Sequence, residues 1–212
     1  FDFYAGGGFL KPDKTYDKKD APNIFPIFEE AGYTVARGYS DYKAKSKDAG
    51  KMILIQEEGK DPSCLPYAID RKSDDLTLAQ ITESAIDFLT KGKNKGFFLM
   101  VEGARIDKSA HSNDYSAVVR EVLDFDKAVE AAIRFAEKDG NTLVIISADH
   151  ETGALALRDG NIKEGKMKAM FVSKGHTPIM VPLFAYGPQS KLFGGVQENS
   201  DVSNKILQLL AK

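Results

Sequence analysis

Short apolar runs alternate with amphipathic segments along most of the chain. Gly, Asn or Asp bounds each run, which is typical of strands that alternate with helices in a layered α/β domain. The apolar runs predict strands at residues 2–5, 34–36, 52–55, 97–101, 143–148 and 181–186. Apolar spacings of three and four predict helices near 24–31, 77–89, 115–138 and 202–210.

The middle of the chain has the clearest pattern. Residues 97–101 are all apolar, the following segment repeats Val118, Val122 and Phe125 at helical spacing, and residues 143–146 are apolar again. Such an order predicts a βαβ unit with two adjacent parallel strands. With no internal repeat in the sequence, we expect residues 1–212 to form one α/β domain, or part of one, without an internal boundary.

Composition narrows the functional classes. The 212 residues carry 29 basic and 31 acidic side chains, a formal net charge of −2, which implies no general affinity for nucleic acid. No apolar run approaches the roughly 18 residues that a membrane-spanning helix needs, so no span is predicted. Cys64 is the only cysteine, which excludes an internal disulfide and a thiolate zinc cluster.

All three histidines lie in settings that suit a metal ligand. Asp107 and His111 are four residues apart, so a helix places both side chains on one face. His150 follows Asp149 directly after a predicted strand, and Glu102 ends another, so we expect both at one edge of the sheet, where sites are commonly built. A single histidine at a strand end is more often a hydrogen-bonded core group than a ligand. Three such settings in one chain, His176 in a Gly-His-Thr-Pro turn included, favour metal binding.

These residues carry a family resemblance. The run Val-Glu-Gly-Ala-Arg-Ile-Asp-Lys-Ser-Ala-His at 101–111, then Ala-Asp-His at 148–150 and Gly-His-Thr at 175–177, resembles the metal-binding framework of alkaline phosphatases. Similarity continues at 65–71, 96–98, 124–126, 141–144, 181–188 and 198–201, which covers most of the chain. The resemblance implies a layered α/β fold with a largely parallel central sheet flanked by helices, present here as a partial domain.

The resemblance also implies roles for individual residues. Hydrolysis of phosphate monoesters would use two Zn²⁺ and one Mg²⁺ and pass through a phosphoserine, with phosphate esters or inorganic phosphate as partners. Lys108 would lie near the phosphate. The implied ligands are Asp107, His111 and His176 for the first zinc, Asp149 and His150 for the second, and Glu102 for magnesium. A homodimer and a periplasmic or secreted location are further expectations from the family.

The nucleophile of the family is missing from these residues. It lies in an Asp-Ser-Ala stretch, whereas the Ser-Ala pairs here, at Ser84, Ser109, Ser116 and Ser147, follow other residues. Ser109 is nearest the metal ligands, but within its turn we expect it to cap backbone or face solvent. We therefore expect the nucleophilic serine and a phosphate-binding arginine upstream of Phe1, and this chain to be a carboxyl-terminal portion that is inactive without that half.

Two departures from the family are local. Pro178 stands where a glycine is usual, and only 25 residues, 151–175, separate His150 from His176.

Two other interpretations of the function stay open. One is a related metallo-hydrolase of the same superfamily, such as a phosphodiesterase or phosphate mutase, and the other is a non-catalytic metal-binding fragment.

Overall fold

The chain folds into two compact units. A computed structural model describes residues 1–56, 60–91 and 96–211. Unit 1 contains Phe1–Ile106 and Ser116–Ala128, and unit 2 contains Asp107–Tyr115 and Val129–Lys212. The expected absence of an internal domain boundary stays a prediction.

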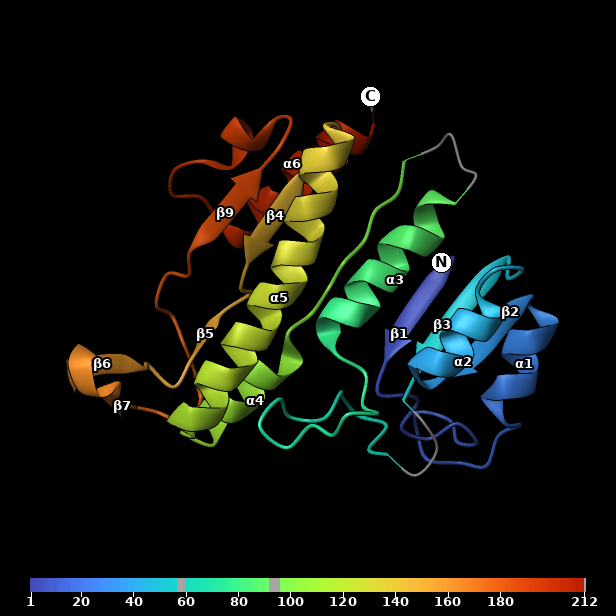
Figure 1. The fold of residues 1–212 in the computed structure, drawn as a ribbon, viewed down its shortest axis with the longest axis horizontal. Coiled ribbons are helices and arrows are strands. Elements are labelled where there is room, and N and C mark those ends of the chain that lie inside the picture. Colours follow the sequence, from blue (N-terminus) through green and yellow to red (C-terminus); the bar gives the residue numbers. More distant parts are fainter. Residues whose placement is uncertain (57–59, 92–95, 212) are drawn as a thin grey trace. The chain divides into compact units, whose positions relative to one another are not determined.

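Unit 1 is built on a parallel sheet of three strands. β1 (Phe3–Gly6), β2 (Tyr33–Arg37) and β3 (Lys51–Ile55) lie in the order β1-β3-β2, with β3 in the centre (Figure 1). Met52 to Ile55 are all buried, as expected for a parallel strand covered on both faces. The predicted strands at 2–5, 34–36 and 52–55 are confirmed.

Three helices accompany this sheet: α1 (Ile24–Glu30), α2 (Gly38–Lys45) and α3 (Leu78–Thr90). Thr77 begins α3 with a capping box, in which the Thr77 hydroxyl accepts the backbone N–H of Gln80 and the Gln80 side chain accepts that of Thr77. The main core packs β3 and its neighbours against α2 and α3. Its buried members are Ala36, Tyr42, Met52, Leu54, Leu76, Ile81, Phe88 and Leu89.

Residues 97–101 do not form the predicted strand. Phe97 and Leu99 pack against the core of unit 1, whereas Phe98 is 61% and Met100 71% exposed, so the side chains alternate as they would in a strand. A strand also needs a neighbouring backbone, and among the described residues no strand pairs with this segment. The helix between the two runs forms, whereas the predicted parallel pair joins runs of different units and stays a prediction.

Two helices contribute residues to both units. α4 (Ala104–His111) carries the Asp107–His111 pair, and α5 (Tyr115–Asp139) is the long helix predicted at 115–138. Within unit 1, Arg71 pairs with Asp124 of α5 through two hydrogen bonds of 2.6 and 2.7 Å. Such a bidentate pair fixes both side chains.

Unit 2 contains only antiparallel pairs among its described strands. β4 (Val144–Ser147) pairs with β9 (Leu183–Tyr186), which confirms both predicted strands but not a parallel neighbour for the first. β5 (Glu151–Thr152) pairs with β8 (His176–Thr177), β6 (Ala156–Asn161) pairs with β7 (Lys166–Met170), and α6 is Asn199–Leu210. The fold class is thus mixed α/β with a parallel sheet.

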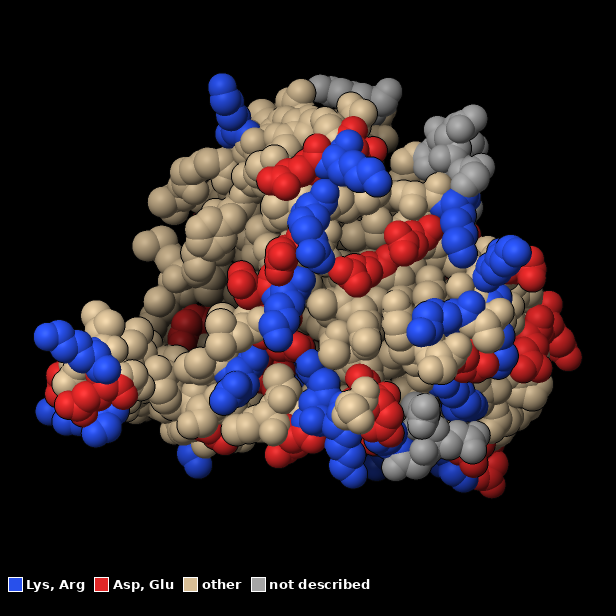
Figure 2. Space-filling view, viewed as in Figure 1, with Lys and Arg blue, Asp and Glu red and all other residues tan. Residues whose placement is uncertain are grey.

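The β6–β7 hairpin was not predicted. Every residue of β6 is exposed, so it lacks the alternation that marks a half-buried strand. Its tip carries charges of both signs (Figure 2), including the ion pairs Lys166–Glu164 at 2.8 Å and Lys168–Asp159 at 3.3 Å. Among the described residues, no helix is long and apolar enough to cross a membrane.

Candidate metal centre

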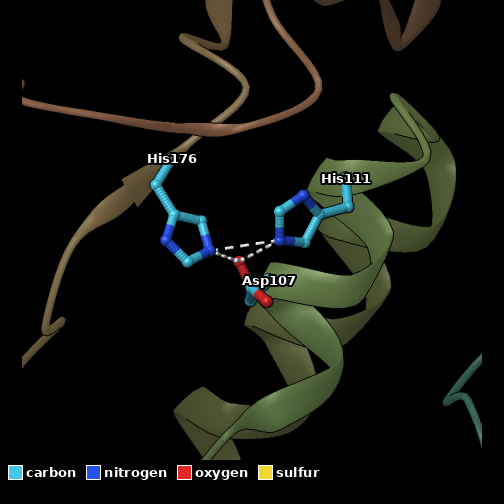
Figure 3. Close-up of side chains that lie close together, drawn as sticks. All are labelled: Asp107, His111 and His176. Carbon is cyan, nitrogen blue, oxygen red and sulfur yellow. Dashed lines mark hydrogen bonds and ion pairs between the residues drawn. The ribbon is translucent and has the colours of Figure 1, made fainter.

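The face of α4 that was predicted from the sequence carries the first two groups of the site. Asp107 and His111 lie one helical turn apart, and Asp107 Oδ1 is 3.4 Å from His111 Nε2 (Figure 3). The His111 Nδ1–H donates to the backbone carbonyl of Lys174. This bond uses Nδ1 and leaves Nε2, the nitrogen on the Asp107 side, available as a metal ligand.

β8 brings His176 to this pair from a distant part of the sequence. The His176 Nε2 is 3.2 Å from His111 Nε2 and 3.7 Å from Asp107 Oδ1. The three ligand atoms therefore form a small triangle in unit 2, with side chains that are all partly exposed. The structure thus brings together the complete protein ligand set expected for the first zinc.

The dimensions of this triangle suit Zn²⁺. Zinc binds imidazole nitrogen and carboxylate oxygen at about 2.0–2.2 Å, so two ligand atoms of a tetrahedral site lie about 3.3 Å apart. The three separations here, 3.2, 3.4 and 3.7 Å, are close to that value. Two nitrogens and one oxygen leave the fourth position open, as in catalytic rather than structural zinc sites.

The second predicted pair lies beside the first group but is less complete. The His150 ring stacks on His176, with 3.6 Å between centroids and an interplanar angle of 20°. His150 Nε2 is 3.4 Å from Asp149 Oδ2, and the Asp149 side chain is 83% exposed. Among the described residues, the three-ligand group does not extend to Asp149 or His150, so these two would need a further ligand.

Thr152 is a polar residue of the site that the sequence analysis missed. It is buried, its hydroxyl donates to Asp107 Oδ1 at 2.6 Å, and its oxygen is 3.2 Å from His150 Nδ1. In the β5–β8 ladder Thr152 is the partner of His176. The two-residue period of a strand places Thr152 on the same side as His150, and this alternation was the signal that could have identified it.

The opposite side of the same ladder holds Glu151, which was also missed. Its carboxylate accepts the hydroxyl of Thr177, its ladder partner, and the backbone N–H groups of Ala154 and Leu155 at 3.0 and 3.4 Å. Burial by itself would raise the pKa of Glu151, but the Thr177 hydroxyl and the two N–H groups favour the charged form and lower the pKa below its usual value. Glu151 therefore holds β8, and with it His176, against β5.

Gly153 makes the close approach that closes this arrangement. Its φ of +89° lies in the region that favours glycine, its N–H donates to Gly175, and its carbonyl accepts from Val172 and Ser173. A Cβ at this position would be 2.8 Å from the Phe171 ring. The backbone around Gly153 thus fixes where the Gly-His-Thr segment lies.

The other predicted positions have different outcomes. Ser109 neither caps backbone nor faces solvent, because it is 2% exposed and its hydroxyl has no partner among the described residues. Glu102 belongs to unit 1, and its role as a magnesium ligand stays a prediction. Lys108 follows Asp107 on α4, and its place near phosphate also stays a prediction. His176 reaches its partners although Pro178 stands two residues later.

Comparison with known proteins decides the family. The family model for alkaline phosphatase matches residues 11–170. This chain belongs to the alkaline phosphatase family. Zn²⁺ and Mg²⁺ are the cofactors of that family, in agreement with the ligand set described above.

Relatives within the alkaline phosphatase family match nearly the whole chain. Alkaline phosphatase 4 of Bacillus subtilis (strain 168) is 32% identical over 276 aligned residues, which cover 99% of this chain and 57% of the relative. Alkaline phosphatase of Escherichia coli (strain K12) is 39% identical over 142 residues, which cover 59% of this chain and 30% of the relative. The chain therefore spans little more than half the length of the Bacillus relative.

Solved alkaline phosphatases share the fold. The enzyme from the Antarctic bacterium TAB5 has a TM-score of 0.83 and 35% identity, and the match covers 98% of this chain and 59% of that one. A cold-active alkaline phosphatase from Shewanella sp. has the same TM-score at 22% identity, which shows the fold alone.

Proposed function

We propose that the protein hydrolyses phosphate monoesters with two Zn²⁺ and one Mg²⁺, through a phosphoserine. The observation that carries this proposal is the triangle of Asp107 Oδ1, His111 Nε2 and His176 Nε2, whose separations suit a zinc ion with an open position. Membership of the alkaline phosphatase family supports the type of reaction.

The residues of this chain would hold and orient the ions. Asp107, His111 and His176 hold the first zinc, Asp149 and His150 supply two ligands of the second, and Glu102 supplies an oxygen to magnesium. When bound, a pair of such ions polarises the phosphoryl group and stabilises the charge on the entering and leaving oxygens. Two solved variants of the TAB5 enzyme with Mg bound in the M3 site support magnesium in this proposal.

The nucleophilic serine would come from outside these 212 residues. The sequence contains no Asp-Ser-Ala tripeptide, and Ser109 is buried. The same absent part would supply the phosphate-binding arginine and the remaining ligands of the second zinc and of magnesium. Lys108 would face the phosphate from α4. A homodimer and a periplasmic or secreted location belong to the same proposal.

Hydrolysis of a chromogenic phosphate monoester tests the proposal. We would assay the whole protein, with its upstream part, in Zn²⁺ and Mg²⁺, beside His176→Ala and beside the 212-residue chain alone. We expect turnover by the whole protein, and none by His176→Ala or by the 212-residue chain alone. Preference for a phosphate diester over the monoester would assign a related superfamily activity, and turnover by the 212-residue chain would contradict the external nucleophile.

A further inference from the structure

One hydroxyl lies between the two groups of metal ligands. Thr152 Oγ1 is 2.6 Å from Asp107 Oδ1, the oxygen that faces His111 and His176, and 3.2 Å from His150 Nδ1. Thr152 is 8% exposed, so water has little access to these bonds. Thr152 has no role in the proposed function as stated above.

The directions of the two hydrogen bonds follow from the groups themselves. A threonine hydroxyl has one proton, and an ionised carboxylate only accepts, so the Thr152 proton lies in the shorter bond to Asp107. The Thr152 oxygen then faces His150 Nδ1 with its lone pairs. A second lone pair at 3.2 Å would be repelled, whereas an Nδ1–H donates to it. The chain of bonds therefore runs from His150 through Thr152 to Asp107.

This direction decides which nitrogen of His150 is free. With the proton on Nδ1, the lone pair is on Nε2, which lies 3.4 Å from Asp149 Oδ2. The Asp149 side chain is 83% exposed, so water can solvate its carboxylate, whereas the buried Thr152 oxygen depends on the Nδ1–H. Two electron-rich atoms then face each other in the way that two ligands of one cation do. The Thr152 oxygen thus orients the His150 ring through Nδ1, as the Lys174 carbonyl orients the His111 ring.

We propose that Thr152 is a positioning residue that fixes the Nδ1–H tautomer of His150 and, through its bond to Asp107, couples the two metal sites. The inference rests on the metal sites of the proposed function, but the tautomer is a property of the metal-free protein. Loss of the hydroxyl removes the bond that Thr152 donates to Asp107 and frees His150 to carry its proton on Nε2. Metal affinity at the Asp149–His150 pair should then fall by a factor of about 10–100, as for other groups that orient a ligand.

The test combines NMR of ¹⁵N-labelled histidine with Co²⁺ titration followed by absorption. The whole protein is compared with Thr152→Val, which keeps the shape without the hydroxyl, and with Thr152→Ser, which restores it. Thr82→Val is the matched control, because it removes another buried threonine hydroxyl, in α3 of unit 1, where the partner is the Leu78 carbonyl. His150→Gln assigns the His150 signals. The spectra are recorded in the metal-free protein over a range of pH, and the tautomer is read from the neutral form of the ring.

We expect His150 to be the Nδ1–H tautomer in the wild type, in Thr152→Ser and in Thr82→Val, and to shift to Nε2–H in Thr152→Val. Co²⁺ affinity at the second site should fall in Thr152→Val alone. An Nε2–H tautomer in the wild type would overturn the proposal, even if Thr152→Val did not fold. So would unchanged Co²⁺ affinity in a folded Thr152→Val. Absence of phosphatase activity with the expected tautomers would reject only the proposed function.

Discussion

The Thr177 hydroxyl donates a hydrogen bond to the Glu151 carboxylate across the two-residue ladder of β5 and β8. Next to Thr177 in the chain is His176, and next to Glu151 is His150. Since side chains alternate in a strand, one side of this ladder is structural and the other carries the histidines. The positions of His150 and His176 thus depend on the contact between Glu151 and Thr177, which are not among the candidate metal ligands.

Removing that carboxylate should loosen the metal centre. Glu151→Ala leaves the Thr177 hydroxyl and the N–H groups of Ala154 and Leu155 without their acceptor, at a cost of about 1–3 kcal/mol in the free energy of unfolding. With β8 less firmly held, Zn²⁺ affinity should fall about 10–100-fold. Denaturant unfolding and a competitive chelator titration measure the two effects.

Glu130→Ala is the matched control for this change. Glu130 is a 62% exposed carboxylate on α5 that pairs with Arg134 at the surface, at 3.5 Å. Such a pair contributes about 0.3–0.5 kcal/mol, and Zn²⁺ affinity should stay at the wild-type value. Equal Zn²⁺ affinities of Glu151→Ala and Glu130→Ala would refute the anchoring role of Glu151.

Gly153→Ala should destabilise unit 2 more than its single methyl group indicates. The φ of +89° is strained for alanine, and the new Cβ would lie 2.8 Å from Cδ1 of Phe171. We expect a loss of about 2–4 kcal/mol in the free energy of unfolding, from strain and overpacking together. The measurement is thermal or denaturant unfolding.

Gly165→Ala separates the two contributions. Gly165 has a φ of +62°, but no atom lies within 4 Å of a Cβ there. It should cost only the backbone strain, about 1–2 kcal/mol. If both variants lost the same stability, the close contact with Phe171 would carry no energy.

Elements that depend on interactions within one segment were predicted from the sequence, whereas those that depend on a distant segment were not. Local signals found α3, α5 and the Asp107–His111 pair, because helical periodicity and a spacing of four are properties of one segment. The apolar run 97–101 was misassigned, because a strand also depends on a backbone partner that its own sequence does not specify. Local alternation also contained a signal for Thr152 that was not used.

The candidate site divides in the same way. His176 was assigned through the family resemblance, since nothing in its neighbourhood in the sequence points to a helix more than sixty positions earlier. Glu151 stands in no motif of the sequence, and only the β5–β8 pairing shows its contact with Thr177. Contacts between distant segments cannot be read from the spacing of either segment.

Glu121 should make unit 1 less stable as the pH rises. Burial on α5, with the nearby charge of Asp124, raises the pKa of Glu121 against the opposing effects of Ala68 N–H and Arg71. Between the unfolded pKa and this raised pKa the folded state binds more protons than the unfolded state, so the free energy of unfolding falls as the pH rises from about 4.3 through the folded pKa. Glu121→Gln keeps an oxygen for the Ala68 N–H and removes the titration.

The pH dependence of unfolding tests this assignment. The stability of Glu121→Gln relative to the wild type should increase across that pH window, whereas Glu130→Gln, at an exposed position, should follow the wild type. A pH-independent difference between Glu121→Gln and the wild type would mean that Glu121 does not titrate differently in the two states.

Zinc should stabilise the protein through the Asp107, His111 and His176 group, because the three ligand atoms converge only in the folded state. A free Zn²⁺ concentration of about 100 times Kd adds about 2.7 kcal/mol to the free energy of unfolding. For a domain of this size that corresponds to an increase in Tm of about 5–10 °C. Scanning calorimetry with and without a chelator measures this increase in Tm.

Two variants test which group binds the stabilising zinc. His111→Gln should abolish the increase in Tm, and Glu164→Gln, in an exposed turn, should keep it. An increase that survived in His111→Gln would place the stabilising zinc elsewhere.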